Sequence, residues 1–300
     1  MKIIISGSSG FIGQALVEGL RQRGHRVIRL VRGVDAAPRP DHVAWDPPQG
    51  RLESSVFEGV DAVINLNGAN IAGGRWTHAY KDELSSSRLQ STKLLAETMA
   101  AMSRPPEVLI NASATGFYGD CGDEVLTEEA SAGAGFLADL TGEWEGATQP
   151  ASAAGIRVVL LRLGLVVGSG GALARMLLPF KMGLGGPIGS GRQWWPWIAM
   201  DDVIGAVIFA LEHLELSGPI NLVSPEETTS RGFARTFGRI LHRPAFLPAP
   251  AFAIRLLTGE MGDALLLSSA RVRPEVLERA GYQFDVPSLE EALSRALDVR

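Results

Sequence analysis

The sequence has few of the residue types on which much enzyme chemistry depends: one cysteine, three tyrosines and only four lysines among its 28 basic residues. A single cysteine, Cys121, excludes an internal disulfide and a metal site built on a cysteine pair. Because phenols and primary amines are so scarce, any reaction that needs a tyrosine or a lysine can be checked residue by residue.

Long apolar runs and long runs of one charge are absent as well. The apolar run at 203–211 is far shorter than the roughly 18 residues that a membrane helix needs. The N-terminal MKIIISGSSG has too short an apolar stretch for a secretory signal. A net charge of −5 without like-charge runs is not typical of binding to a phosphate backbone. We therefore expect a cytoplasmic protein that has neither a membrane nor a nucleic acid as its partner, and no metal.

The alternation of apolar segments in the first half of the chain predicts the fold class. Short β-branched runs alternate with longer segments of helical period, which is typical of βαβ units. The expected class is α/β, a doubly wound, Rossmann-type parallel sheet with a smaller C-terminal substrate lobe. We predict strands at 2–6, 26–31, 42–46, 61–66, 107–113 and 157–164, and helices that end at Gly24, cover 81–102 and cover 135–155.

The composition changes after residue 164. Residues 166–198 are dense in glycine, tryptophan and proline, which predicts a loop-rich lobe with one short helix. A helix at 201–214, a strand at 219–224 and a helix at 230–242 follow, and prolines then mark a terminal module. The predicted organisation is a first domain at 1–165 completed by about 201–245, a substrate lobe inserted at 166–200, and a small helical module at 246–300.

The segment GSSGFIG lies directly between the first strand and the first helix. Gly7 permits a tight turn, Gly10 lets a pyrophosphate approach the helix N-terminus, and Gly13 lets the helix pack closely on the sheet. Phe11 and Ile12 complete the predicted contacts. An ordinary strand-to-helix turn could also contain these glycines, but the order strand, loop, helix, strand within 32 residues favours a dinucleotide site.

The end of the second strand indicates which dinucleotide binds. A site for NAD keeps an acidic residue there for the ribose 2′-hydroxyl, whereas this chain has Arg32, whose guanidinium suits a 2′-phosphate. The alternative is a solvated surface arginine. After the strand at 61–66, small and amide residues lie where the adenosine half would pass, so Leu66, Asn67 and Gly68 are predicted contacts unless they form a plain turn. The predicted cofactor is NADP.

These residues resemble the extended short-chain dehydrogenase/reductase superfamily, the branch that contains nucleotide-sugar epimerases and dehydratases. GSSGFIG, NLNGANI, SSRLQSTKLL, ASATGFYGD and the segment 160–197 are most similar to an atypical "epimerase family" described as NADP-dependent sugar-nucleotide epimerases. From about residue 247 the chain resembles the small domain of unknown function that ends those proteins. The resemblance implies Glu83, Arg88 and Val166 as further cofactor contacts, with an exposed helix face as the alternative for Arg88.

The superfamily transfers protons with a Ser or Thr, a Tyr, and a Lys four residues after that Tyr. Ser113 matches the first member. By alignment the Tyr-x-x-x-Lys pair should fall near Phe136 and Leu140. None of the tyrosines has a lysine four residues later: Tyr80, Tyr118 and Tyr282 are followed there by Leu84, Gly122 and Val286.

Two functions remain open at this point. In the first, the protein is an NADP-dependent oxidoreductase or sugar-nucleotide epimerase with an atypical active site, for which Ser113 and Tyr118 are the catalytic candidates. Without a lysine neighbour, Tyr118 would keep a pKa near the ordinary value of about 10 and would serve as a donor rather than a base, or would only pack in its loop. The alternative is a catalytically silent NADP(H)-binding sensor or assembly factor.

Further side chains are candidates for contacts with a small-molecule substrate, for which a sugar nucleotide is one option. We expect a monomer or a homodimer. Charged and aromatic residues could grip phosphate and base, although tryptophans there could equally be core. For the acidic pair at 201–202 we expect a helix-capping role. The candidates are Arg75, Trp76 and His78 in one loop, Lys181, Arg192, Trp194 and Trp195 in the lobe, and Asp120, Cys121 and Asp123 in a turn that is otherwise solvated.

Overall fold

The computed structural model describes residues 1–33 and 40–298 and divides into two compact units that interleave along the chain. The first unit comprises Met1–Ser113, Leu140–Leu161 and Val207–Pro219. The second comprises Ala114–Asp139, Arg162–Ala206 and Ile220–Arg300. The domain bounds predicted from the sequence remain a prediction.

A seven-stranded sheet confirms the predicted α/β class. Its strand order is β10-β7-β5-β4-β1-β2-β3, and the pairings from β3 through β2, β1 and β4 to β5 are parallel. The chain order reverses at β1, whose neighbours are β2 and β4, and ligands of doubly wound sheets bind at such a reversal. The strands are β1 (Lys2–Ser6), β2 (Arg26–Arg32), β3 (His42–Trp45), β4 (Ala62–Asn65), β5 (Val108–Ala114), β7 (Arg157–Leu163) and β10 (Gly218–Leu222).

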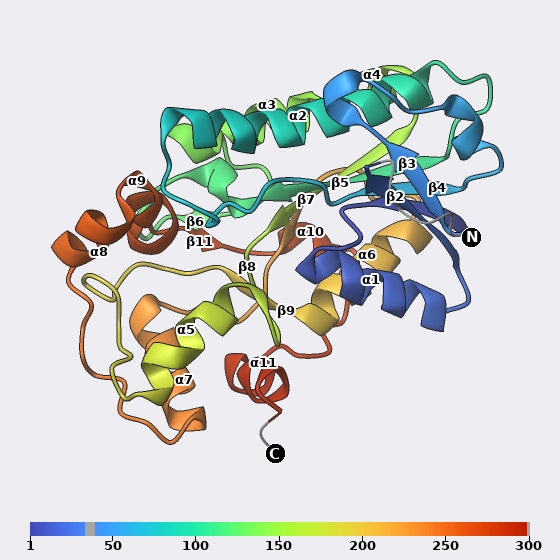
Figure 1. Ribbon diagram of the computed structural model, residues 1–300. Coiled ribbons are helices and arrows are strands. Elements are labelled where there is room, and N and C mark those ends of the chain that lie inside the picture. Colours follow the sequence, from blue (N-terminus) through green and yellow to red (C-terminus); the bar gives the residue numbers. More distant parts are fainter. Residues whose placement is uncertain (34–39, 299–300) are drawn as a thin grey trace. The chain divides into compact units, whose positions relative to one another are not determined.

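Helices cover both faces of this sheet in the first unit. Helix α1 (Phe11–Gln22) lies on one face, and α2 (His78–Ala100) lies on the other (Figure 1). The continuous helix predicted at 135–155 is wrong, because α3 (Phe136–Gly146) ends before α4 (Gln149–Ala153) begins. Pro150 lies in the first turn of α4, the position that tolerates a residue without an N–H group. Two short 3-10 turns, η1 (Pro47–Gln49) and η2 (Ser54–Phe57), complete the connections.

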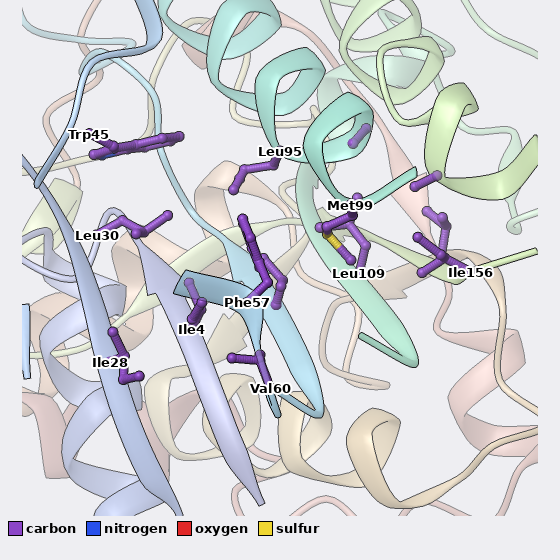
Figure 2. Packing of buried hydrophobic residues seen from close by; sticks show 14 residues of the cluster. Ile4, Ile28, Leu30, Trp45, Phe57, Val60, Leu95, Met99, Leu109 and Ile156 are labelled. Atoms are coloured by element: carbon purple, nitrogen blue, oxygen red, sulfur yellow. The ribbon is translucent and has the colours of Figure 1, made fainter. Parts of the chain in front are cut away.

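The core of the first unit lies between the sheet and α2. Figure 2 shows Leu95 and Met99 of α2 together with strand residues such as Ile4 and Leu109. These four side chains are completely buried. Leu95 and Met99 are four positions apart, the spacing that places side chains on one face of a helix. The remaining labelled members are Ile28, Leu30, Trp45, Phe57, Val60 and Ile156.

A buried polar network crosses the same interior at the carboxyl ends of β1, β4 and β5. Asn65 Oδ1 accepts from Ser6 Oγ at 2.5 Å, and Asn65 Nδ2 donates to Asn111 Oδ1 at 2.6 Å and to Thr92 Oγ1 at 2.8 Å. Thr92 of α2 also accepts from Trp144 Nε1 of α3 at 2.9 Å and donates to Asn111. The network therefore ties three strands to two helices.

The second unit has its own core around α5 (Gly171–Lys181), α7 (Ser230–Ile240) and α11 (Leu289–Ala296), which lie near one another in Figure 1. Two short parallel pairings were not predicted. β8 (Leu165–Val167) pairs with β9 (Trp197–Ala199), and β6 (Val125–Leu126) pairs with β11 (Arg271–Val272). Strands of two or three residues carry too little periodicity to be recognised in a sequence rich in glycine and tryptophan.

The other elements are short, apart from one helix that was predicted at 201–214. No helix in the ranges 1–33 and 40–298 combines the length and the apolar character of a membrane span. The elements not yet named are η3 (Thr115–Tyr118), α6 (Met200–Glu212), α8 (Ala251–Thr258), α9 (Glu260–Gly262), the π-helical turn η4 (Asp263–Leu267) and α10 (Glu275–Arg279).

We expect Thr92→Val to lower the free energy of unfolding by about 1–3 kcal/mol, because the isosteric side chain leaves buried donors of Asn65 and Trp144 without an acceptor. Denaturant unfolding measures the change. Thr98→Val is the matched control on the same helix, since the Thr98 hydroxyl only donates to Leu94 O in its own helix. Equal effects of the two substitutions would contradict a special role for the network.

Candidate functional site

The turn from β1 into α1 leaves no room for a side chain at Gly7 or at Gly13. Gly7 has a φ of +70°, and a Cβ there would lie 2.5 Å from the carbonyl carbon of Leu66. A Cβ at Gly13 would overlap the carbonyl oxygen of Gly7. Gly10 precedes α1 without a side-chain cap, and the first turn of α1 has no acidic residue. The helix therefore presents free N–H groups and the positive end of its dipole, a combination that suits a pyrophosphate.

The loop that follows β4 lies directly against this glycine loop. The backbone of Leu66 and Asn67 is what a side chain at Gly7 would strike. Asn67 N donates to Asn65 Oδ1 at 3.2 Å, and Ala69 N donates to Ser87 Oγ at 3.0 Å. The structure thus brings the predicted glycine-loop contacts and the predicted contacts at 66–68 together.

Arginines stand at the other side of the glycine loop, on β2. Arg32 is exposed at the carboxyl end of that strand, where a 2′-phosphate of the adenosine ribose would lie. Arg29, which the sequence analysis did not consider, donates from Nε to Ser8 Oγ at 2.9 Å and from Nη2 to Ser8 O at 2.8 Å. A second guanidinium therefore holds the glycine loop next to the predicted phosphate position.

Arg88 lies under the loop after β4. It donates to Leu84 O at 2.9 Å and to Ala69 O at 3.0 Å, and its guanidinium carbon lies 5.1 Å from the centroid of the Trp144 ring. Burial lowers the pKa of Arg88 to about 10. Glu83 is exposed on α2, and Arg88 forms no ion pair with any residue that the structure describes. Phe11 and Ile12 are half-buried in the first turn of α1, and Val166 lies on β8 in the second unit.

Ser113, the first catalytic candidate, is almost completely buried in β5. Its hydroxyl donates to Glu145 Oε1 of α3 at 2.6 Å. Glu145 was not predicted as a partner, although it lies in the helix predicted at 135–155, five residues after Leu140. As placed, the Ser113 hydroxyl joins a strand to a helix and is not open to a substrate, and its catalytic role stays a prediction.

Tyr118, the second candidate, is fully buried in the second unit. Its hydroxyl donates to Asn221 Oδ1 at 2.7 Å and accepts from Arg162 Nη1 at 3.0 Å. Burial raises the pKa of Tyr118 above its ordinary value, which corrects the expectation of an unperturbed phenol and strengthens the expectation that it does not act as a base. A catalytic role for Tyr118 would require its hydroxyl to leave these partners.

A buried carboxylate completes the surroundings of Tyr118. Glu128 Oε1 accepts from Asn221 N at 2.9 Å and from Val276 N at 3.2 Å, while Oε2 has no hydrogen-bond partner among residues 1–33 and 40–298. Burial raises the pKa of Glu128. The Glu128 carboxylate therefore joins the backbone at Asn221 to the backbone at Val276, both in the second unit. No sequence motif predicts this role.

The predicted capping and turn carboxylates hold the C-terminal segment. Asp201 and Asp202 lie in the first turn of α6, as expected, but buried Asp202 also accepts from Asp285 N at 2.7 Å and from Val286 N at 3.1 Å. Asp120 is exposed, as expected for a solvated turn, and it also accepts from Ser269 N at 3.0 Å. Half-buried Cys121 donates weakly to Tyr118 O.

The aromatic candidates divide between core and surface. Trp195 belongs to the core of the second unit, whereas Trp194 is half-buried, donates to Asp123 Oδ1 at 2.7 Å, and has the Arg271 guanidinium 4.8 Å from its ring centroid. Trp76 is buried and donates to Ile71 O at 2.9 Å. The other four candidates are exposed: Arg75, His78, Lys181 and Arg192. Their substrate contacts stay predictions.

The sequence analysis missed the residues that hold the site in place. Asn65 and Asn111 each lie in an otherwise apolar strand, in DAVINL and EVLINAS, and a buried amide in such a run is a signal that could have been used. Thr92 and Trp144 carry no comparable signal, since their roles depend on contacts far along the chain.

Profiles of two known families match the chain. The profile of the NAD dependent epimerase/dehydratase family matches residues 3–222, and that of a domain of unknown function, DUF1731, matches residues 249–296. An epimerase-family match followed by a C-terminal match to DUF1731 confirms the family resemblance that the sequence motifs indicated.

Individual relatives are similar over nearly the whole chain. An epimerase family protein of Mycobacterium leprae is 43% identical over 295 residues, which cover 98% of this chain and 95% of the relative. The crystal structure of human epimerase family protein SDR39U1 (isoform 2) with NADPH has a TM-score of 0.90 and 34% identity, with 99% of both chains covered. UDP-glucose 4-epimerase of Thermotoga maritima with UDP-glucose has a TM-score of 0.76, with 100% and 98% covered, but at 18% identity it shows the fold alone.

We expect Gly13→Ala to lower the free energy of unfolding by about 1–3 kcal/mol and to abolish dinucleotide binding, because its Cβ would overlap the carbonyl of Gly7. Gly142→Ala in α3 is the control: a Cβ there meets nothing within 4 Å, so the helix should gain about 0.5–1 kcal/mol. Thermal unfolding and ligand titration of both variants measure these effects. Normal binding by Gly13→Ala would contradict the proposed close packing.

Proposed function

The chain belongs to the NAD dependent epimerase/dehydratase family, and on this premise we propose that it is an NADP(H)-dependent oxidoreductase or sugar-nucleotide epimerase with an atypical active site. The observation that carries the proposal is the glycine loop, where Gly7 and Gly13 have no space for a Cβ and the N-terminus of α1 is left uncapped. A bare loop against a helix N-terminus fits a pyrophosphate.

The first unit supplies the residues that would hold the cofactor. Backbone N–H groups at the start of α1 would bind the pyrophosphate, and the loop at 66–68 would lie along the nucleoside. When bound, NADPH supplies a hydride to a carbonyl carbon, or NADP⁺ accepts one from a carbinol. The protein's part is to hold that reactive face in position and to direct a proton to or from the oxygen.

The preference for NADP over NAD rests on the end of β2. Arg32 offers a guanidinium where an NAD site would have a carboxylate, and Arg29 adds positive charge behind Ser8. The human relative, 34% identical over 99% of both chains, was crystallised with NADPH, which supports the same choice here.

A sugar nucleotide is the substrate class that we propose. The structural relative from Thermotoga maritima was solved with UDP-glucose, although at 18% identity the support comes from the shared fold. In this chain Trp194 and Arg271 of the second unit form a cation–π pair, and Arg271 also forms an ion pair with Glu227 at 2.7 Å. An aromatic ring and a guanidinium are groups that bind a base and a phosphate. We propose that the lobe at 166–200, which contains Trp194, binds the substrate together with Arg271.

The alternative function is that of a silent NADP(H)-binding sensor or assembly factor. One specific observation favours it: the hydroxyls of both catalytic candidates, Ser113 and Tyr118, are buried and bonded to other side chains. The tyrosine and the lysine that the superfamily uses for proton transfer have no counterpart in the sequence, and the hydroxyl of Ser113, which matches the third group, is bonded to Glu145. Turnover is therefore the decisive measurement.

For cofactor choice, we expect Arg32→Ala to weaken NADPH binding about 10–100-fold, because a charge-assisted contact to the 2′-phosphate is lost, and to change NADH binding less than about 2-fold. Fluorescence titration of both nucleotides measures this. Arg26→Ala is the control, since Arg26 is equally exposed at the opposite end of β2. An unchanged preference in Arg32→Ala would refute the assignment of the 2′-phosphate.

For catalysis, we expect slow NADPH oxidation with some member of a panel of carbonyl compounds and UDP-sugars, followed at 340 nm. Tyr118→Phe should lower the unfolding temperature, because Asn221 and Arg162 lose a buried partner, while turnover per folded molecule changes less than about 3-fold. A loss of turnover above about 100-fold in a folded variant would instead assign Tyr118 to proton transfer. The same measurement on Ser113→Ala shows whether Ser113 takes part in proton transfer or only holds the structure together. Tight NADPH binding without turnover on any substrate would favour the sensor.

A further inference from the structure

Helix α8 exposes to solvent the kind of face that a helix normally buries. Phe252, Leu256 and Leu257 are 73%, 74% and 72% exposed, and none of residues 251–258 is buried. Successive helix residues are rotated by about 100°, so these three side chains and Ala253 share one arc of about 140°. An apolar stripe of this width is typical of a helix face that packs against a core. We call Phe252, Ala253, Leu256 and Leu257 the α8 stripe.

The other side of α8 is packed within the second unit. Ile254 and Thr258 lie on that side, where a Cβ at Gly262 of α9 would lie 2.8 Å from Ile254 Cγ2 and would overlap Thr258 Oγ1. The Thr258 hydroxyl donates to Ile254 O at 2.6 Å. Helix α9 follows α8 and lies beside it (Figure 1). Helix α8 therefore has one side fixed against α9 and a second, apolar side that faces solvent.

Other exposed apolar side chains do not form a comparable face. Among the described residues, the helices α1, α2 and α3 have no large apolar side chain that is exposed. Leu178, Met182 and Leu184 are exposed on and after α5, but exposed Lys181 lies between them in the chain, and Arg243 donates to Lys181 O at 3.0 Å. That second group is therefore accompanied by two cations.

The segment that carries the α8 stripe is close to neutral. The charged residues of 251–263 are Arg255, Glu260 and Asp263, and Arg255 forms an ion pair with Asp263 at 2.7 Å. In a two-fold dimer a surface meets its own copy, so a neutral apolar stripe can pack against itself without repulsion between like charges. An anionic lipid surface attracts clusters of lysine and arginine, which this segment lacks. The charge of the segment therefore favours a second copy of the chain over a membrane surface.

The α8 stripe is also large enough for a small dimer interface. One phenylalanine and two leucines at these exposures offer about 300–400 Å² of apolar surface on each copy. A specific interface needs about 1,000 Å² in total, or about 500 Å² on each copy, of which about 60% is apolar. The requirement is thus about 300 Å² of apolar surface on each copy, and the three side chains meet it.

We propose that the α8 stripe is the interface of a homodimer, in which Phe252, Leu256 and Leu257 of one copy pack against the same side chains of a second copy. The stripe lies within residues 249–296, which match DUF1731, so the proposal gives that domain a role in self-association. It belongs to the second unit, whereas the glycine loop belongs to the first, and the dimer forms without NADP(H).

Sedimentation velocity of the full chain, over a concentration series in the micromolar range, tests the proposal. We expect the wild type to show a monomer–dimer equilibrium of modest affinity, since the interface is near the lower size limit. Leu256→Glu and Phe252→Ser should each weaken self-association at least about 10-fold, because a polar group would lose its water in the interface. Both side chains are exposed in the single chain, so the unfolding temperature of the dilute monomer should stay unchanged.

Leu214→Glu is the matched control for adding a carboxylate at an exposed leucine. Leu214 is 68% exposed but belongs to the first unit, so its substitution should leave self-association unchanged. Leu178→Glu makes the same change in the apolar group on α5 and should also have no effect. A loss of the dimer in either control equal to that in Leu256→Glu would overturn the proposal, because the effect would then not be specific to α8.

Three other results would overturn it as well. A wild type that stays monomeric at every concentration would mean that the α8 stripe does not bind a second copy. A dimer that persists in both Leu256→Glu and Phe252→Ser would place the interface elsewhere. The third result comes from pelleting the protein with vesicles of phosphatidylglycerol and phosphatidylcholine. A monomer that pellets with these vesicles, and no longer does so after Leu256→Glu, would assign the stripe to a lipid surface instead.

Discussion

A set of buried hydrogen bonds, made by Ser6, Asn65, Asn111, Thr92 and Trp144, determines how the first unit is arranged around the edge of the sheet at which we propose that the cofactor binds. In an interior of low dielectric constant each of these polar groups must find a partner, and each finds it in another element. Apolar packing allows α2 and α3 to slide by a fraction of a turn. The directional bonds do not, so they determine the register of both helices against β1, β4 and β5.

The positions of the candidate binding groups follow from this network. Asn65 Oδ1 also accepts from Asn67 N, which anchors the loop that lies against Gly7. Arg88 is one helical turn before Thr92 on α2, and both contact Trp144. The same bonds that pair the buried amides thus bring a glycine loop, a second loop and a guanidinium to one edge of the sheet. A dinucleotide bound there would meet preformed partners, so little binding free energy would be lost in ordering them.

Much of the fold and part of the site could be predicted. The continuous apolar runs in KIIIS and AVIN and the period of about four in the helix after Gly10 reflect local burial, which can be recognised from neighbouring residues. The break at Pro150 was equally local but was overlooked. β6 and β11 could not be found, since each is two residues long and is stabilised only by a partner more than a hundred residues away. For the same reason no motif pointed to the bond between Ser113 and Glu145.

The sequence by itself determined the class of fold, the glycine loop, the charge of Arg32 and the absence of a Tyr-x-x-x-Lys pair, because these depend on residue types and on short spacings. Only the tertiary structure decided what the candidate hydroxyls do. Tyr118 and Ser113 have the right chemistry in the right segments, yet burial and long-range partners engage both. Whether a polar group is free for chemistry depends on every element that packs around it, and that information is spread over the whole chain.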